Sequence, residues 1–466
     1  MNPVTGRMDR GTMSLQDEIA FGTRAHEELL QEYSRLDSPA LQQYVAGVGN
    51  RLAAQTHRPE LTWTFTVLDS PDINAFATTG GYVYITRGLM AYLNSEAELA
   101  GVLGHEMGHI TARHVARQQR DQQIGGLLQV IGVLGGAYLG GERGAELGAQ
   151  IAGGGAQAAW LLPRSREHEL EADRLGMDYL ARSAIDPQAM TRVIDVLKLQ
   201  ETYSNDRARA LGRPMQRMPS WLATHPSNDE RLAQLRGRTT PAGASGTTND
   251  PGRDRYLRAI DGMAYGDSRA QGVSRGAHFF HEPLGFTLKK PAAWQFQNSS
   301  ERLIVVSQDQ QAAVILAAVP GMNGDHNRII REALKADSGR PERINLNGLP
   351  ATYFFGTRQG EEIEATIVTF RNYDYVLSPM AQSREAQARY RNEVLAVINS
   401  FRAMNADDVR AARPFVLHTV AMPRSGSFRD LSAAPELGDA ESQLRVLNQA
   451  YPSGTVAAGR LVKTIQ

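Results

Sequence analysis

The sequence predicts a multidomain chain with a mainly α-helical domain that holds a small β element, then an α+β domain and a small C-terminal module. Its 466 residues exceed the length of about 250 to 300 residues at which single domains usually stop growing. Residues 16–237 have a mainly helical pattern with a β element near 61–86, whereas short β-branched and aromatic runs follow from about 276. Residues 238–254 have almost no apolar side chain to bury and are predicted to be a linker.

The α+β domain is placed at residues 255–405. An amphipathic helix near 390–401 could cover its sheet, because apolar residues recur there at helical spacing. In outline this part is similar to PsbP-like domains, although none of its residues has recognisable chemistry. Its strands are predicted at Leu303–Ser307, Ala312–Val319, Ala351–Phe355 and Ala365–Phe370.

The last piece, residues 413–466, has a pattern of two helices and a closing strand. It contains Phe428–Leu431, then Leu444–Asn448, then Gly459–Lys463. This short motif resembles a LysM module, which implies peptidoglycan as a partner. A plain C-terminal packing extension is the alternative.

Composition excludes several classes of function. The 50 basic residues balance the 50 acidic ones, so no global field recruits nucleic acid or anionic lipid, and no nucleic-acid partner is expected. The absence of cysteine excludes disulfides, thiolate metal sites and a cysteine nucleophile. Any metal must therefore be held by histidines and carboxylates.

A helix is predicted from Leu99 to Arg117. Ser95 is its expected N-cap, and Glu98 three residues later completes the pattern of a capping box.

This helix contains a His-Glu-x-x-His pattern. The i,i+4 spacing of His105 and His109 places both imidazoles on one face, which suits two ligands of one tetrahedral Zn²⁺. Glu106 lies beside the first ligand, where it can take a proton from a zinc-bound water. Two unrelated histidines on an ordinary helix are the alternative.

A second helix at residues 165–176 offers a third ligand. Glu169 and Asp173 share one face at i,i+4, so Glu169 can complete a His₂Glu site while Asp173 holds a ligand histidine from behind. His168 and Glu171 are expected to project elsewhere and to be solvated.

Together these motifs resemble the HtpX and CAAX prenyl protease family of gluzincin zinc metallopeptidases, in particular its soluble periplasmic, BepA-like branch. The second helix carries the string Ser-Arg-x-x-Glu-x-Glu-Ala-Asp-x-x-Gly. The resemblance covers about residues 16–237 and implies a gluzincin-type fold. It also implies zinc as cofactor, with zinc ligands at His105, His109 and Glu169, the general base at Glu106 and the supporting acid at Asp173.

Two further segments match the family. Asn74 to Ile85 resembles the strand before the active-site helix, whose edge could bind an extended peptide through Asn74, Ala75, Phe76 and Ala77. An ordinary hairpin with a Gly-Gly turn is compatible with the same residues. His225, in a Thr-His-Pro segment, is implied to act at the zinc, either as a stabiliser of the oxyanion or as a gate on the open coordination position.

A glycine-rich stretch from Ile124 to Trp160 lies between the two metal helices. Charged residues interrupt it, which favours a helical hairpin over the membrane spans of relatives. Peripheral membrane contact is possible through Leu127, Leu128, Ile131, Val133, Leu134 and Leu139.

The family also suggests where the protein works. Residues 1–15 lack the pattern of a signal peptide, but residues 2–6 spell the string that follows a lipid-bearing cysteine in exported members. We therefore expect an N-terminal segment left after removal of a leader, and a periplasmic or outer-membrane-associated protein.

The sequence thus predicts a zinc-dependent endopeptidase that hydrolyses envelope or misfolded proteins by Glu-assisted attack of zinc-bound water. The alternative is a cell-envelope binding or chaperone protein with a gated or latent metal site.

Overall fold

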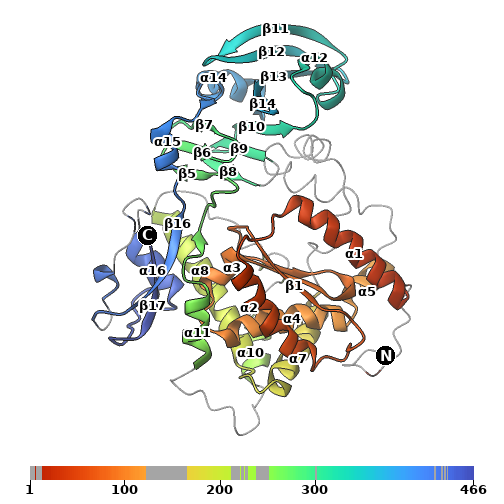
Figure 1. Cartoon of the computed structure of the whole chain (residues 1–466), viewed down its shortest axis with the longest axis vertical. Coiled ribbons are helices and arrows are strands. Elements are labelled where there is room, and N and C mark those ends of the chain that lie inside the picture. The colour runs from red at the N-terminus through yellow and green to blue at the C-terminus, as the bar shows by residue number, and fades with distance from the viewer. Residues whose placement is uncertain are drawn as a thin grey trace. The chain divides into compact units, whose positions relative to one another are not determined.

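The computed structural model describes residues 13–121, 165–210, 229–237, 251–299, 302–424 and 439–466, together with Gly6, Trp221, His225, residues 427–431, Ala434 and Leu437. These residues form two compact units (Figure 1). The first combines the described residues up to 266 with residues 415–466, and the second spans residues 267–414. The first unit is mainly helical and the second is rich in β-strands, which confirms the prediction of a multidomain chain.

A three-stranded sheet lies at the centre of the N-terminal part. Its order is β1 (Thr64–Leu68), β3 (Tyr82–Thr86), β2 (Ala75–Ala77), with β3 parallel to β1 and antiparallel to β2. Gly80 and Gly81 form the turn before β3 at φ of 80° and 100°, which glycine adopts without a Cβ penalty. Because β2 stands at the end of the strand order, it is an edge strand.

Helices cover both faces of this sheet. Helix α1 (Leu15–Glu32) begins with a capping box between Ser14 and Asp17, and its apolar side chains pack on Phe76 and Tyr84. The opposite face packs against α2 (Pro39–Ala53) and α4 (Glu96–Thr111).

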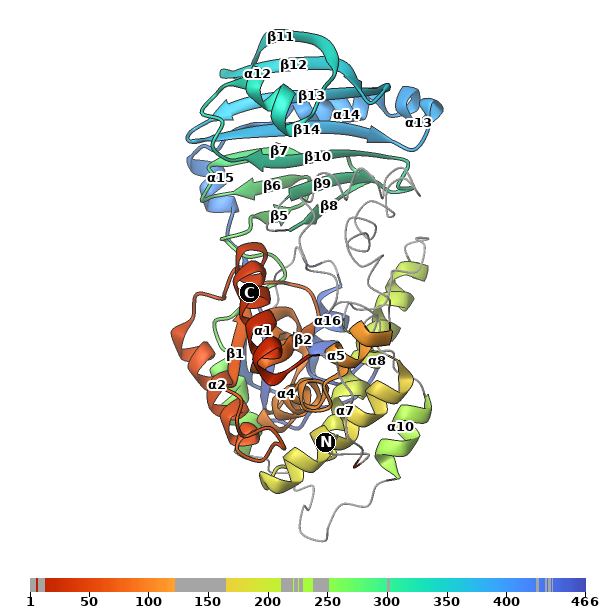
Figure 2. The ribbon, with the colours of Figure 1, turned by 90° about the vertical axis from the view of Figure 1, so that its right-hand side faces the viewer.

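Further helices of the first unit pack against α4 or against its neighbours. Helix α7 packs along α4, and α8 contacts the same helix (Figure 2). These helices are α3 (Arg87–Tyr92), α5 (His114–Asp121), α7 (Arg166–Arg182), α8 (Ala189–Ala210), α10 (Asp229–Arg236) and α11 (Pro251–Ala259).

The C-terminal segment belongs to the first unit. Its strands β16 (Phe415–Ala421) and β17 (Leu461–Ile465) form a sheet with β4 (Ala264–Tyr265), and η4 (Phe428–Asp430) and α16 (Ala440–Leu447) pack beside it.

Buried polar contacts hold this segment against the start of α4. Nζ of Lys463 donates to the carbonyls of Ala91 and Leu93 at 2.7 and 2.8 Å, and Asn94 Nδ2 donates to the Leu447 carbonyl at 2.9 Å. The chain also divides between residues 414 and 415, close to the predicted boundary at 413, but the segment that follows belongs to the first unit and buries its apolar side chains there. The LysM resemblance stays a prediction.

The second unit is an antiparallel β structure with helices beside it. A four-stranded sheet has the order β15 (Arg402–Ala403), β7 (Phe286–Lys289), β6 (His278–His281), β5 (Val273–Arg275). A seven-stranded sheet has the order β11 (Ser338–Leu346), β12 (Leu349–Arg358), β13 (Glu361–Phe370), β14 (Tyr373–Ala381), β10 (Ala312–Val319), β9 (Arg302–Ser307), β8 (Trp294–Asn298).

The helices of this unit are α12 (His326–Arg328), η3 (Ile329–Ala333), α13 (Arg384–Arg389), α14 (Arg391–Asn399) and α15 (Ala406–Ala411). The four predicted strands lie within β9, β10, β12 and β13, and the predicted covering helix is α14. The unit begins at residue 267 rather than 255, because α11, which overlaps the predicted linker, packs in the first unit.

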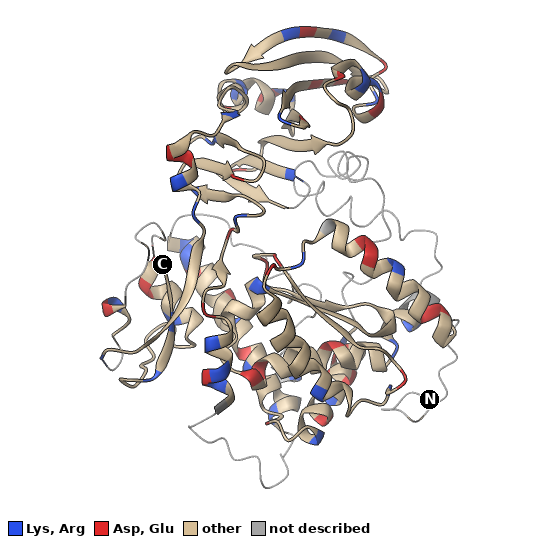
Figure 3. Ribbon diagram, in the orientation of Figure 1, with Lys and Arg blue, Asp and Glu red and all other residues tan. Residues whose placement is uncertain are grey.

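Basic and acidic residues are interspersed along the described helices and strands (Figure 3). No helix among the described residues is long and apolar enough to cross a membrane. Residues 1–5, the glycine-rich stretch with its predicted membrane contacts, and residues 238–250 of the predicted linker lie outside the described residues.

Candidate metal centre

Helix α4 carries the His-Glu-x-x-His pattern. Ser95 caps it by accepting from the Glu98 amide at 3.1 Å, but the Glu98 carboxylate accepts from the Asn94 amide at 2.7 Å. The predicted capping box is thus half formed. The helix also ends earlier than predicted, at Thr111, because Arg113 adopts a φ of 57° and α5 then begins at His114.

Glycines allow α4 and α7 to approach closely. A Cβ on Gly108 would lie 2.7 Å from the Ala172 carbonyl oxygen, and one on Gly176 would lie 3.1 Å from the His105 backbone nitrogen. Only hydrogen fits at such contacts. The glycine inside the His-Glu-x-x-His pattern therefore brings the histidines of α4 within reach of the acids of α7.

Three predicted ligands meet in this interface. The Nε2 atoms of His105 and His109 lie 3.0 Å apart, and the Glu169 carboxylate lies 3.4 Å from each of them. All three side chains are at most 2% exposed.

His225 lies in the same cluster. Its Nδ1 is 3.0 Å from Oε1 of Glu169 and 3.3 Å from Nε2 of His105. One ligand atom from each of His105, His109, Glu169 and His225 lies within 4.8 Å of the others. Four protein donors thus converge on one point.

Asp173 supports this cluster through His105. Its Oδ1 lies 2.9 Å from His105 Nδ1, and both carboxylate oxygens accept from the guanidinium of Arg231, at 2.7 and 2.8 Å. The third guanidinium nitrogen of Arg231, Nη1, lies 2.9 Å from Glu169. Arg231, which sequence reasoning missed, therefore ties together two acids of α7.

The electrostatics of the cluster favour a cation. Burial by itself lowers the pKa of His105, but the carboxylates of Asp173 and Glu169 raise it to about 9. Burial raises the pKa of Glu169, yet the neighbouring histidines hold it well below its usual range. The acids thus stay ionised and attract positive charge, which a proton or a metal ion can supply.

The residues present fit a divalent metal. Glu106, Glu169 and Asp173 are all 1% exposed, and Arg231 is the one guanidinium that the described contacts place among them. Such a surplus of buried negative charge is costly unless a cation offsets it. Three imidazole nitrogens and a carboxylate oxygen form a donor set that zinc accepts.

Glu106 lies beside the four donors. Its Oε1 accepts from the indole nitrogen of Trp221 at 3.2 Å and lies 3.5 Å from Nε2 of His225. Sequence reasoning missed Trp221, since a lone tryptophan outside any motif gives no signal. The indole holds the Glu106 carboxylate in place next to the metal position.

A second group of side chains lies behind His109. His114 Nδ1 is 2.7 Å from His109 Nδ1, and His114 Nε2 is 3.2 Å from Glu171. Burial lowers the pKa of His114 to about 3. The prediction that Glu171 is solvated is wrong, because this residue is 8% exposed and pairs with Arg117 at 2.8 Å. His168 is half-buried and stacks on His114 at 4.2 Å.

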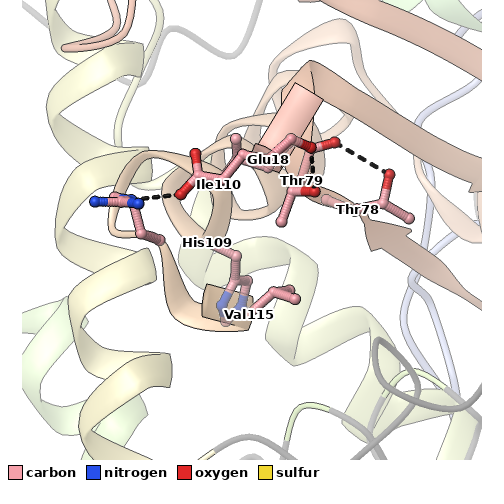
Figure 4. Close-up of a pocket in the computed structure, with 8 residues that line it drawn as sticks. Glu18, Thr78, Thr79, His109, Ile110 and Val115 are labelled. Carbon is pink, nitrogen blue, oxygen red and sulfur yellow. Dashed lines mark hydrogen bonds and ion pairs between the residues drawn. The ribbon is translucent and has the colours of Figure 1, made fainter. Parts of the chain in front are cut away.

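The predicted peptide-binding residues lie next to the cluster. Asn74 and the whole of β2 are buried, and β2 packs against α4. A small pocket adjoins the end of β2 (Figure 4). It is lined by Glu18, Ala77, Thr78, Thr79, His109, Ile110, Arg113 and Val115. Ala77 and His109 thus share this pocket, whereas Asn74, Ala75 and Phe76 do not line it.

Comparison with known proteins shows what the part of the chain around this centre is similar to. Residues 39–239 match peptidase family M48. The chain is 35% identical over 241 residues to the β-barrel assembly-enhancing protease of Yersinia pestis, covering 51% of this chain and 46% of that protein. The Escherichia coli protein of the same name is 33% identical over 240 residues, with the same two coverages. The mitochondrial metalloendopeptidase OMA1 of Schizosaccharomyces pombe is 27% identical over 236 residues, which are 50% of this chain and 64% of that protein.

The chain spans about half the length of the first two of these relatives. Among solved structures, cyanobacterial PsbP from Synechocystis is 10% identical with a TM-score of 0.22, over 30% of this chain and 98% of that one. A score this low carries no argument about the fold, so the PsbP-like assignment stays a prediction. Residues 39–239, which match this family, thus contain the buried cluster of candidate metal ligands at His105, His109, Glu169 and His225.

Proposed function

We propose that this chain, which carries a peptidase family M48 domain similar to that of the β-barrel assembly-enhancing proteases, is a zinc-dependent endopeptidase. The observation that supports this most strongly is the convergence of four buried ligand atoms, from His105, His109, Glu169 and His225, beside Glu106. A zinc ion in this cluster would acidify a bound water and polarise the carbonyl of a peptide bond.

Glu106 is the residue placed to move the proton. It lies beside the donors without being one of them, so its carboxylate is available as a base. It would accept a proton from the attacking water and return it to the leaving amine. Trp221, which donates to the same carboxylate, would keep it oriented during both transfers.

His225 decides whether the site is open. A catalytic zinc site has three protein ligands and one exchangeable position, whereas four protein ligands make a closed site. His225 lies among the donors, so we propose that it occupies the exchangeable position at rest and leaves it before substrate binds. Its other possible role, stabilising the oxyanion, requires it to face the substrate carbonyl.

The substrate is proposed to be an extended polypeptide. The edge strand β2 can offer main-chain hydrogen bonds, which do not depend on side-chain identity. Ala77, the last residue of β2, lines a pocket together with His109. The names of the bacterial relatives suggest a role in the cell envelope, with envelope or misfolded proteins as substrates in the periplasm or at the outer membrane. Peptidoglycan contact through the LysM-like segment, residues 413–466, remains part of this proposal.

A second function follows from the position of His225. The observed four-donor cluster would also suit a binding or chaperone protein whose metal site is latent. The two functions differ in whether an unfolded protein is cut.

Incubation of the purified chain with casein, with and without a chelator, tests the proposed function. Zinc-dependent cleavage, abolished by the chelator and restored by added zinc, is expected. Zinc-loaded chain that binds casein without cutting it would favour the latent site.

A further inference from the structure

The imidazole of His109 has polar partners on both of its nitrogens. Nε2 points into the donor cluster, 3.0 Å from Nε2 of His105 and 3.4 Å from Glu169. Nδ1 lies on the opposite side, 2.7 Å from Nδ1 of His114. The ring therefore joins the cluster to a second histidine outside it.

The His114 ring is fixed on both of its own nitrogens. It is fully buried, meets the His109 ring edge-on at 4.9 Å and 68°, and places Nε2 3.2 Å from the Glu171 carboxylate. The guanidinium of Arg117 donates to the same Glu171 oxygen, Oε2, at 2.8 Å.

The local backbone produces this arrangement. Helix α4 ends at Thr111, and the left-handed conformation of Arg113 turns the chain so that α5 starts at His114. The Arg113 guanidinium pairs with the buried carboxylate of Glu18 on α1, which fixes the turn from outside the helix. His114, five residues after His109, is thereby directed back onto its ring.

The proton positions follow from the role of His109. A neutral imidazole that offers its lone pair at Nε2 carries its proton on Nδ1. His109 Nδ1 then donates to His114 Nδ1, so that His114 carries its own proton on Nε2 and donates it to Glu171. The three side chains form one directed hydrogen-bond chain that ends on a carboxylate.

We propose that His114, anchored by Glu171, is a positioning residue that fixes the tautomer and orientation of His109 for metal binding. This inference rests on the proposed zinc site. His105 receives the same support in a different way, since Asp173 contacts its Nδ1 directly at 2.9 Å. The two histidine ligands thus differ, because a neutral imidazole separates His109 from its carboxylate.

Zinc affinity of the full chain, measured by competition with a chromophoric chelator, tests this role. His114→Phe keeps a ring of similar size but removes both nitrogens, so affinity should fall about 10- to 100-fold, as is usual for loss of a ligand's hydrogen-bond partner. His114→Asn places an amide oxygen near the former Nδ1 and should recover most of the affinity. His57→Phe, which removes a histidine elsewhere in the first unit, is the matched control and should bind as wild type does.

A second measurement keeps the inference testable if His114→Phe does not fold. In zinc-loaded wild-type chain labelled with ¹⁵N-histidine, His114 should show a protonated Nε2 and an unprotonated Nδ1, and Glu171→Gln should shift its Nε2 signal. The reverse tautomer at His114, or wild-type zinc affinity in a folded His114→Phe, would overturn the proposal.

These readouts separate the inference from the proposed function. A chain that binds zinc as expected but cuts no protein would contradict the protease and leave the role of His114 intact. A chain that binds no zinc would contradict both.

Discussion

Nδ1 of His225 lies 3.0 Å from Oε1 of Glu169, inside the cluster that would hold the metal. A side chain in this position competes with water for the last coordination site. The contact therefore supports the proposal that His225 occupies the exchangeable position at rest.

Replacement of His225 tests the gate. His225→Ala should raise the turnover of casein, because the exchangeable position opens to water while His105, His109 and Glu169 keep the metal. If His225 instead stabilises the oxyanion, kcat should fall about 10² to 10³-fold with zinc retained. Unchanged turnover would exclude both roles.

Replacement of Glu106 separates the base from the ligands. Glu106→Gln should keep zinc bound and abolish cleavage, because the amide cannot accept a proton. Zinc content and casein cleavage are measured on the same preparation, with Glu167→Gln on the exposed start of α7 as the control. Turnover within about tenfold of wild type would remove Glu106 from the mechanism.

Replacement of the acids of α7 tests the ligand assignment. Glu169→Ala should lower zinc content, whereas Asp173→Ala should reduce affinity or activity about ten- to hundredfold, as loss of a supporting hydrogen bond usually does. Glu167→Ala serves as the control. Normal zinc stoichiometry in Glu169→Ala would show that another carboxylate binds the metal.

Two arginines of α10, one buried and one on the surface, are expected to differ in their contribution to the free energy of unfolding. Arg231 is 1% exposed and pairs with Asp173 and Glu169, so Arg231→Met should lower the free energy of unfolding by about 3 to 5 kcal/mol, the usual effect of leaving a buried charge unpaired. Arg236 pairs with Asp195 on the surface, and Arg236→Met should change stability by less than about 1 kcal/mol. Chemical denaturation of both variants measures the difference. Equal effects would show that the Arg231 contacts do not stabilise the fold.

The C-terminal segment yields a further stability prediction. Lys463→Met should destabilise the first unit, because the carbonyls of Ala91 and Leu93 lose a buried donor next to the start of α4. Arg460→Met, at an exposed position of the same segment, is the control. Thermal unfolding that is identical in the two variants would contradict this docking.

Helical spacing and strand positions could be predicted from the sequence, because they depend on neighbouring residues. Contacts between residues far apart in the chain could not. The spacing of His105, His109, Glu169 and Asp173 follows from helical periodicity, and the strands of the second unit follow from apolar runs bounded by turns. The break at Arg113 could not be predicted, because arginine seldom adopts positive φ and the ion pair with Glu18 that accompanies it spans 95 residues. Trp221 and Arg231 lack any motif of their own, so only tertiary structure reveals their contacts with the site.

The packing of the C-terminal segment also could not be predicted from its sequence pattern. Its local pattern of helix and strand suggested a separate module, but its buried residues Leu417, Leu444 and Val462 belong to the core that α4 also enters. Periodicity shows that a face is apolar without showing which surface covers it.

Metal analysis of the purified full chain tests whether the buried cluster binds one zinc ion. Wild-type chain should contain one zinc ion per molecule, and the double variant His105→Ala/His109→Ala, folded as judged by circular dichroism, should contain none. Equal zinc content in the two proteins, or a wild-type chain that takes up no zinc even when it is supplied, would contradict the account.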